Sequence, residues 1–178
     1  MIYFITGGER SGKSRYAQHL ALEISDHPLY IATARKWDKD FEDRIQRHQL
    51  ERDERWKSIE AEKYLDKINL DNQVAVIDCV TLWLTNFFTD SEFNIESSLK
   101  QAKEVFDQLT TINATLIIIS NEIGMGVHSS HEAGRKFVEL QGWMNQYIAS
   151  RSDEVILMVS GIPVTIKEKN LCQTLKHI

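Results

Sequence analysis

Eight consecutive residues near the start of the chain are typical of a loop that binds phosphate groups. The segment Gly7-Gly8-Glu9-Arg10-Ser11-Gly12-Lys13-Ser14 fits the pattern G-x-x-x-x-G-K-[ST]. Glycines at positions 7 and 12 permit backbone conformations in which successive N–H groups face phosphate oxygens. The Lys13 ammonium is expected on the β- and γ-phosphates, and the Ser14 hydroxyl is expected to hold Mg²⁺. We therefore predict that residues 7–14 bind a nucleoside triphosphate.

A carboxylate at the end of a later apolar run is the second candidate. Asp78 follows Val74-Ala75-Val76-Ile77, a run typical of a buried strand. Proteins with this kind of phosphate loop often place a Mg²⁺-coordinating acid at such a strand end. The alternative is an ordinary aspartate that caps the following helix. We favour the metal role, with Ser14 and Asp78 as the metal-binding pair.

A histidine in a charged segment is the third candidate. If residues 38–55 form a helix, Arg44, His48 and Arg52 lie at positions i, i+4 and i+8 and share roughly one face. Neighbouring cations disfavour imidazolium, so His48 would stay neutral and could act as a nucleophile. From these residues alone, a histidine on a solvated helix remains the more common interpretation.

Other residues are less directly connected with chemistry. The segment Asn121–Gly126 follows the strongest apolar strand, and its glycines are equally consistent with close approach of a ligand and with a simple turn. Trp83 and Trp143 occur at helical spacing, which favours core positions over a platform for substrate. Cys79 lies in an apolar run and is expected in the core.

The elements that must position these residues alternate along the chain, which predicts an α/β fold around a mostly parallel sheet. Expected strands are residues 2–5, 29–33, 56–60, 74–78, 114–120 and 154–160, with residues 164–166 as an antiparallel partner at the end. Expected helices are residues 15–24, 38–55, 82–88, 92–110 and 132–150. We expect one domain over residues 1–178, with about ten frayed residues at its end. In such sheets, ligands bind outside the carboxyl ends of the strands.

Composition narrows the class of protein. The chain has 178 residues, 42% of them hydrophobic, and a net charge of −5, which argues against nucleic acid as a partner. An apolar run of about 18 residues is lacking, so we predict no membrane span. The phosphate loop begins too early to leave room for a secretory signal, and two distant cysteines are typical of a reducing compartment, so we expect a cytoplasmic protein.

Several segments together resemble one family, the bifunctional adenosylcobinamide kinase/adenosylcobinamide-phosphate guanylyltransferases of cobalamin biosynthesis. The similar segments share one register over residues 1 to about 167. They are Thr6–Arg15, Tyr30–Ala34, Arg44–His48, Asp78–Asn86, Ser120–Gly126, the helix that carries Arg135, Phe137, Gly142 and Asn145-Gln146, and the strands around Asp153–Val155 and Ser160–Pro163.

The resemblance implies two reactions. The hydroxyl of the aminopropanol arm of adenosylcobinamide receives a γ-phosphoryl group from GTP or ATP, and the resulting phosphate then accepts GMP from GTP to give adenosylcobinamide-GDP. The family carries GMP on a histidine that matches His48, so the resemblance identifies His48 as catalytic. Lys13 of the phosphate loop is the second catalytic residue, expected to stabilise the developing charge. It also implies a RecA-like phosphate-loop fold, a homotrimer, and nucleotide contacts beyond the loop at Thr33, Ala34, Arg35, Gln49, Leu50, Glu51, Arg52, Glu60 and Asp78.

Two departures from the family pattern bear on the site. Glu9 replaces a usual alanine, and His128-Ser129-Ser130-His131 replaces a usual V-P-E-N beside the expected active site. Two other functions compete with the family's reactions. A simple small-metabolite kinase would leave His48 unmodified, whereas a GTPase switch is disfavoured because Asn121 begins no N-K-x-D motif and Asp78 begins no D-x-x-G motif.

Overall fold

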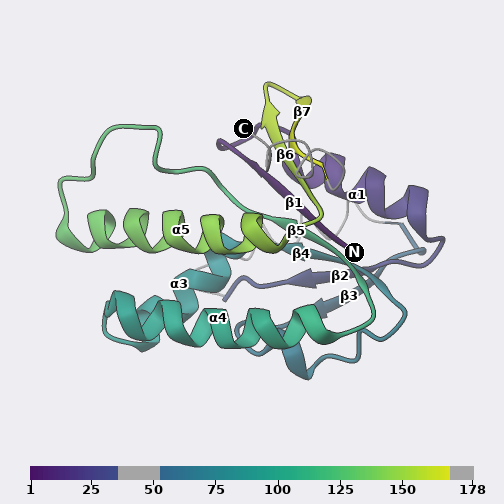
Figure 1. Ribbon diagram of the computed structural model, residues 1–178, viewed down its shortest axis with the longest axis horizontal. Helices are drawn as coiled ribbons and strands as arrows, with labels where there is room; N and C mark the ends of the chain where they lie inside the picture. The colour runs from purple at the N-terminus through teal and green to yellow at the C-terminus, as the bar shows by residue number, and fades with distance from the viewer. Residues whose placement is uncertain (36–52, 169–178) are drawn as a thin grey trace, which may run out of the picture.

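A seven-stranded sheet between two layers of helices forms the body of the molecule (Figure 1). The computed structural model describes residues 1–35 and 53–168. The strand order is β3-β2-β4-β5-β1-β6-β7, and every pairing is parallel except that of β6 with β7. The prediction of a mostly parallel α/β sheet with an antiparallel strand at its C-terminal end is therefore confirmed.

The bounds of the elements agree closely with those expected. The strands are β1 (Ile2–Gly7), β2 (Leu29–Ala32), β3 (Lys57–Glu60), β4 (Val74–Asp78), β5 (Thr115–Ile119), β6 (Glu154–Val159) and β7 (Ile162–Lys167). The helices are α1 (Lys13–Ile24), α3 (Val80–Asp90), α4 (Ile95–Thr111) and α5 (Glu132–Arg151), with a short 3₁₀ turn η1 (Leu65–Lys67). The helix expected over residues 38–55 falls mostly outside the described residues, as does the end of the chain expected to fray.

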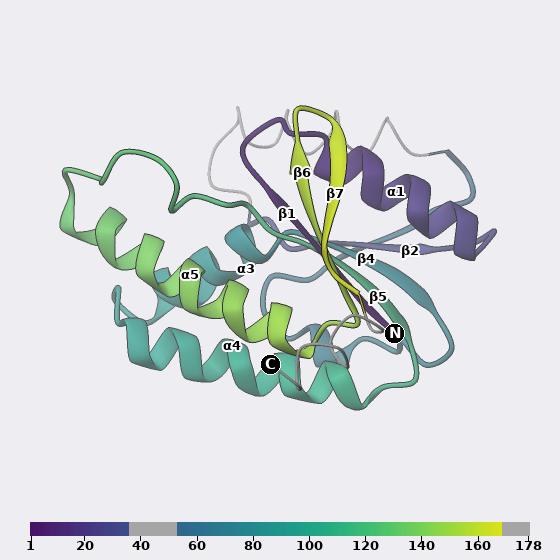
Figure 2. The same ribbon diagram turned by 45° about the horizontal axis from the view of Figure 1, so that its top comes forward.

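Alternate residues of the central strands pack into two separate cores. In β1, Phe4 packs into the cluster that α3, α4 and α5 cover, and Ile5 packs into the cluster covered by α1. In β4, Ile77 packs into the first of these clusters and Val76 into the second. Because successive side chains of a strand face opposite sides, a strand buried on both faces must be apolar throughout. Figure 2 shows α1 on one side of the sheet and α4 and α5 on the other.

One helix begins later than expected. The pattern predicts a helix from Glu92, but α4 begins at Ile95, because Glu92 and Phe93 have positive φ angles of 51° and 63°. The Asn94 side chain then accepts a hydrogen bond of 2.9 Å from the Ser97 amide. An asparagine in this position satisfies one of the free N–H groups of the first helical turn, so it fixes the start of the helix.

The two tryptophans expected in the core have different environments. Trp83 is 2% exposed, and its Nε1 donates a hydrogen bond of 2.7 Å to the Lys63 carbonyl. Its ring meets the Phe87 ring edge-on, with 5.4 Å between the ring centroids. Trp143 is 42% exposed, so the core prediction is wrong for this residue. The buried face of α5 consists of residues such as Leu140, Met144 and Ile148. Trp143 lies beside this face, on the outer surface of the helix.

These two tryptophans give a matched test of the packing. We expect Trp83→Ala to lower the free energy of unfolding by about 3–5 kcal/mol, because it leaves a cavity in the core. Trp143→Ala should change it by less than about 1 kcal/mol. Urea denaturation followed by circular dichroism measures both, and equal losses would contradict the assignment of Trp83 alone to the core.

Candidate functional site

The carboxyl ends of the central parallel strands bring several of the predicted site residues together at one edge of the sheet. The phosphate loop follows β1, Asp78 ends β4, and the segment from Ser120 follows β5. In the register of the sheet, Asp78 lies opposite Ala32 on one side and Ile119 on the other. This edge is where open α/β sheets bind their ligands.

The phosphate loop has the expected backbone. Gly7 and Gly12 have φ angles of 152° and 94°, as their predicted roles require. A Cβ on Gly7 would lie 2.6 Å from the Met158 carbonyl oxygen, so β6 leaves no room for a side chain there. The loop is also held from outside, because the Gly161 amide in the β6–β7 turn donates to the Ser11 carbonyl at 3.0 Å.

Lys13 lies at the start of α1 with its side chain folded back over the loop. Its Nζ donates to the Gly8 carbonyl at 2.6 Å, and the residue is 6% exposed. Burial lowers the pKa of Lys13, while Asp78 and Glu9 act in the opposite direction. A buried ammonium that bonds loop oxygens can exchange these partners for phosphate oxygens, and the N-terminus of α1 adds partial positive charge at the same place.

Asp78 is bound from two directions. Its Oδ2 accepts a hydrogen bond of 2.8 Å from the Ser14 hydroxyl and one of 2.6 Å from the Tyr30 hydroxyl. The residue that precedes α3 is Cys79, and its side chain makes no capping hydrogen bond. Asp78 thus bonds Ser14 of the phosphate-binding motif and Tyr30 of β2 rather than the first turn of α3. This argues against the alternative that Asp78 is a helix-capping aspartate.

The oxygen atoms of Ser14 and Asp78 suit a hard cation such as Mg²⁺. The two predicted ligands are adjacent, and both supply oxygen, the donor that Mg²⁺ prefers. Across the described residues 1–35 and 53–168, three or more acidic, histidine or cysteine side chains do not gather into a metal cluster. A Mg²⁺ ion held here would therefore draw its remaining ligands from nucleotide phosphates and water, as is common for this ion.

Thr33 is expected to contact the nucleotide, but its polar groups form hydrogen bonds within the protein. Its hydroxyl donates to the Cys79 carbonyl at 2.8 Å and accepts from the Cys79 amide at 2.9 Å. Its own amide donates to the Asp78 carbonyl, and its carbonyl accepts from Asn86. Cys79 itself is buried, as expected, and burial raises the pKa of its thiol to about 12, so it is not a nucleophile near neutral pH.

Arg35 forms ion pairs rather than facing the site with a free guanidinium. It bonds Glu62 at 2.7 Å and binds both oxygens of Asp90, at 2.8 and 3.1 Å. Lys63 also donates to Asp90, at 2.7 Å. Hydrogen bonds from Arg35 and Lys63 hold the pKa of Asp90 well below its usual range. The network ties the chain after β2 to the end of α3.

The other predicted nucleotide contacts are only partly described. Glu60 ends β3 in the same row of the sheet as Ala32 and Asp78, and it is exposed at that edge. Ala34 is half-buried next to Arg35. Glu9 is exposed, and its carboxylate is close enough to Lys13 to oppose the lowering of the Lys13 pKa. The predicted residues His48, Gln49, Leu50, Glu51 and Arg52 lie outside the described residues.

The loop after β5 is joined directly to the phosphate loop. The Glu122 amide donates to the Gly7 carbonyl at 2.9 Å, and the Asn121 amide donates to the Thr81 hydroxyl at 3.2 Å. Buried behind them, Ser120 and Asn145 share a hydrogen bond of 2.7 Å. This segment is therefore fixed at its first residues and turns outward beyond them.

Sequence reasoning missed three residues that arrange the site. Tyr30 orients Asp78, Gly161 supports Ser11, and Asn86 donates to the carbonyls of Thr33 and Glu62, both at 2.8 Å. Tyr30 and Asn86 lie within segments that match the family pattern, so a polar residue in an apolar strand or helix was the available signal. Gly161 also lies in a matching segment, but its contact with Ser11 depends on the sheet order and could not be predicted from the residues around it.

Comparison with known proteins identifies the family of the chain. Residues 3–166 match the model of the family described as cobinamide kinase / cobinamide phosphate guanyltransferase. The bifunctional adenosylcobalamin biosynthesis protein CobU of Escherichia coli is 34% identical over 94% of this chain and 100% of its own length. CobP of Pseudomonas aeruginosa is 35% identical, covering 94% of this chain and 98% of its own, and CobU of Salmonella typhimurium is 35% identical, covering 94% and 100%. With its phosphate loop and parallel sheet in place, the chain belongs to the cobinamide kinase / cobinamide phosphate guanyltransferase family.

Proposed function

We propose that this chain carries out both reactions of its family, the phosphorylation of adenosylcobinamide and the transfer of GMP from GTP to the product, at the edge of the sheet where Ser14 meets Asp78. The 2.8 Å contact between these side chains is the observation that carries the proposal. It joins a hydroxyl of the phosphate loop to a strand-end carboxylate, the pair that phosphoryl transfer with a nucleoside triphosphate requires.

In the kinase step, residues of the phosphate loop bind and orient the triphosphate. Lys13 leaves the Gly8 carbonyl and places its ammonium on the β- and γ-phosphates, where it stabilises the charge that develops during transfer. Ser14 and Asp78 hold Mg²⁺, which supplies further neutralisation of the phosphate charge when it is bound. Tyr30 keeps Asp78 turned toward Ser14. GTP and ATP both fit this arrangement, since it contacts only phosphates.

In the guanylyl step, His48 acts as the nucleophile. Its ring nitrogen forms a bond to the α-phosphorus of GTP, and the bond from that phosphorus to the bridging oxygen breaks to release pyrophosphate. An oxygen of the adenosylcobinamide phosphate then attacks the same phosphorus, and the nitrogen–phosphorus bond breaks. The support for His48 is the resemblance of Arg44–His48 to the family pattern.

The remaining nucleotide contacts are proposed at Ala34, Glu60 and the residues after His48. Since the polar groups of Thr33 are already hydrogen-bonded, its proposed role is to hold the ends of β2 and β4 together beside the nucleotide. We also propose that the enzyme is a homotrimer in the cytoplasm. The helices of the described residues include none long and apolar enough to cross a membrane.

The histidine step has a direct test. Incubation with Mg²⁺ and GTP labelled at the α-phosphate should label the native chain and leave His48→Ala unlabelled. The label should be lost in acid and stable in alkali, as expected for a phosphorus–nitrogen bond. GTP binding without any label would contradict guanylyl transfer and leave the simple small-metabolite kinase.

The carboxylate of Asp78 predicts a dependence on metal. Removal of divalent cations with a chelator should abolish both activities, and added Mg²⁺ should restore them. Asp78→Asn should raise the Mg²⁺ concentration needed for half-maximal kinase rate by about ten-fold or more, since one charged ligand is lost. An unchanged Mg²⁺ requirement in this variant would contradict the metal role of Asp78.

Tyr30 is expected to act through Asp78 as a positioning residue. Tyr30→Phe keeps the ring and its edge-on contact with Trp56 but removes the hydroxyl that donates to the carboxylate. A hydrogen bond to a charged acceptor contributes about 1.5–3 kcal/mol, so we expect kcat to fall about ten-fold or more and the Mg²⁺ requirement to rise. Tyr64→Phe, at a tyrosine that is 57% exposed, is the matched control. Normal Mg²⁺ dependence in Tyr30→Phe would contradict the positioning role.

A further inference from the structure

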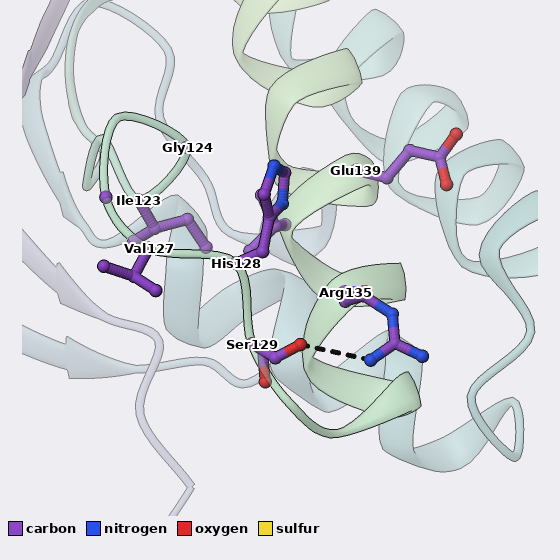
Figure 3. A pocket seen from close by; sticks show the side chains of 9 residues that line it. Ile123, Gly124, Val127, His128, Ser129, Arg135 and Glu139 are labelled. Atoms are coloured by element: carbon purple, nitrogen blue, oxygen red, sulfur yellow. Dashed lines mark hydrogen bonds between the residues drawn. The ribbon is translucent and has the colours of Figure 1, made fainter.

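A pocket with a volume of about 260 Å³ lies between the loop after β5 and the first turns of α5 (Figure 3). Its lining includes Ile123, Val127 and Val138 as apolar residues and His128, Arg135 and Glu139 as polar ones. Figure 3 shows the loop passing beside α5, with the His128 ring next to the helix. None of these residues has a part in the phosphate chemistry described above.

One wall of the pocket is connected along the chain to the phosphate site. The loop that forms one wall begins at Glu122, whose amide bonds Gly7 of the phosphate loop. The next residue, Ile123, already lines the pocket. Because β5 and β1 are parallel neighbours, this loop leaves the sheet at the same edge as the phosphate loop. A molecule that reaches the γ-phosphate from outside can therefore rest on this loop.

The pocket wall is held against the helix. Arg135 donates from Nη1 to the carbonyls of Ser129 and Ser130, at 3.1 and 2.9 Å. Ser129 lies directly over Gly134, where an added Cβ would clash with its side chain. The loop can approach this closely only because α5 has a glycine in its first turn, so the chain's own contacts form the pocket.

The surface around the pocket has the chemistry of a large ligand with an apolar body and polar margins. Met125 is 80% exposed and Val127 is fully exposed, although neither side chain is favoured in water. Beside them, Arg135 bonds Ser129 and Ser130 through Nη1 and makes no hydrogen bond from Nε or Nη2 to the other described residues, so these nitrogens can donate to amide oxygens of a ligand. Glu139 offers carboxylate oxygens to amide N–H groups. A compact nucleotide has no need of such a surface.

We propose that the surface formed by residues 123–129 and the start of α5 binds the corrin ring of adenosylcobinamide and its amide side chains. This inference rests on the proposed kinase function, because the acceptor must present its aminopropanol hydroxyl to the γ-phosphate held by Lys13. The ring is too large to enter the phosphate loop, and its amide-bearing margin matches the polar groups of the pocket. His128 and Ser129 belong to the segment that departs from the family pattern, so this segment adjusts the fit of the acceptor.

Two glycines permit a matched test. A Cβ added at Gly126, in the pocket, or at Gly142, outside it on α5, meets no atom within 4 Å. Gly126→Leu therefore places a side chain at the pocket without disturbing the free protein, and Gly142→Leu controls for the added bulk. We expect Gly126→Leu to raise KM for adenosylcobinamide in the kinase reaction at least ten-fold. KM for GTP and the GTP-dependent labelling of the chain should stay within two-fold, and Gly142→Leu should behave as the native enzyme.

Other outcomes separate the possible failures. An unchanged KM for adenosylcobinamide in Gly126→Leu, with a native circular dichroism spectrum, would overturn the acceptor site. A rise in KM for GTP that matches the rise for adenosylcobinamide would also overturn it, since the pocket would then hold the nucleotide. If the native enzyme fails to phosphorylate adenosylcobinamide although it binds GTP, the proposed kinase function fails and the inference fails with it.

Discussion

The hydrogen bond between Ser14 and Asp78 is the contact on which the proposed chemistry depends. The two residues are far apart in the sequence, one at the start of α1 and the other at the end of β4. They meet because β1 and β4 both pair with β5 in parallel, which brings their carboxyl ends to one edge. A shift of either strand by one residue would also exchange its two buried faces, so packing of the two cores fixes this register.

Buried polar groups hold the strand ends around this contact, in addition to the apolar packing of the two cores. Thr33 bridges β2 to the residue after β4, and Asn86 reaches from α3 to the end of β2. Ser120 and Asn145 do the same for β5 and α5. Buried hydrogen bonds are directional, and an unmade partner costs free energy. They therefore define positions at the edge of the sheet more narrowly than apolar contacts do.

The two sides of the site differ in how they are built. The phosphate side is enclosed by close backbone contacts, such as that of Gly7 with Met158, and suits small charged groups. The side beyond Glu122 opens onto exposed apolar residues and a pocket. This division suits a reaction between a nucleotide and a much larger acceptor. It also explains why a short polar segment, residues 128–131, can vary without disturbing the phosphate loop.

The sequence alone determined the sheet class, most strand positions and the phosphate loop, because these depend on local periodicity and on glycine at positions 7 and 12. It also identified Asp78, since a carboxylate at the end of an apolar run is a local signal. The tertiary structure decided the contacts that depend on strand order: Tyr30 turns Asp78 toward Ser14, Asp90 holds Arg35, and Gly161 supports Ser11. It also decided that Trp143 lies outside the core while Trp83 lies within it. Helical spacing places a side chain on a face of its helix, whereas burial depends on which other elements cover that face.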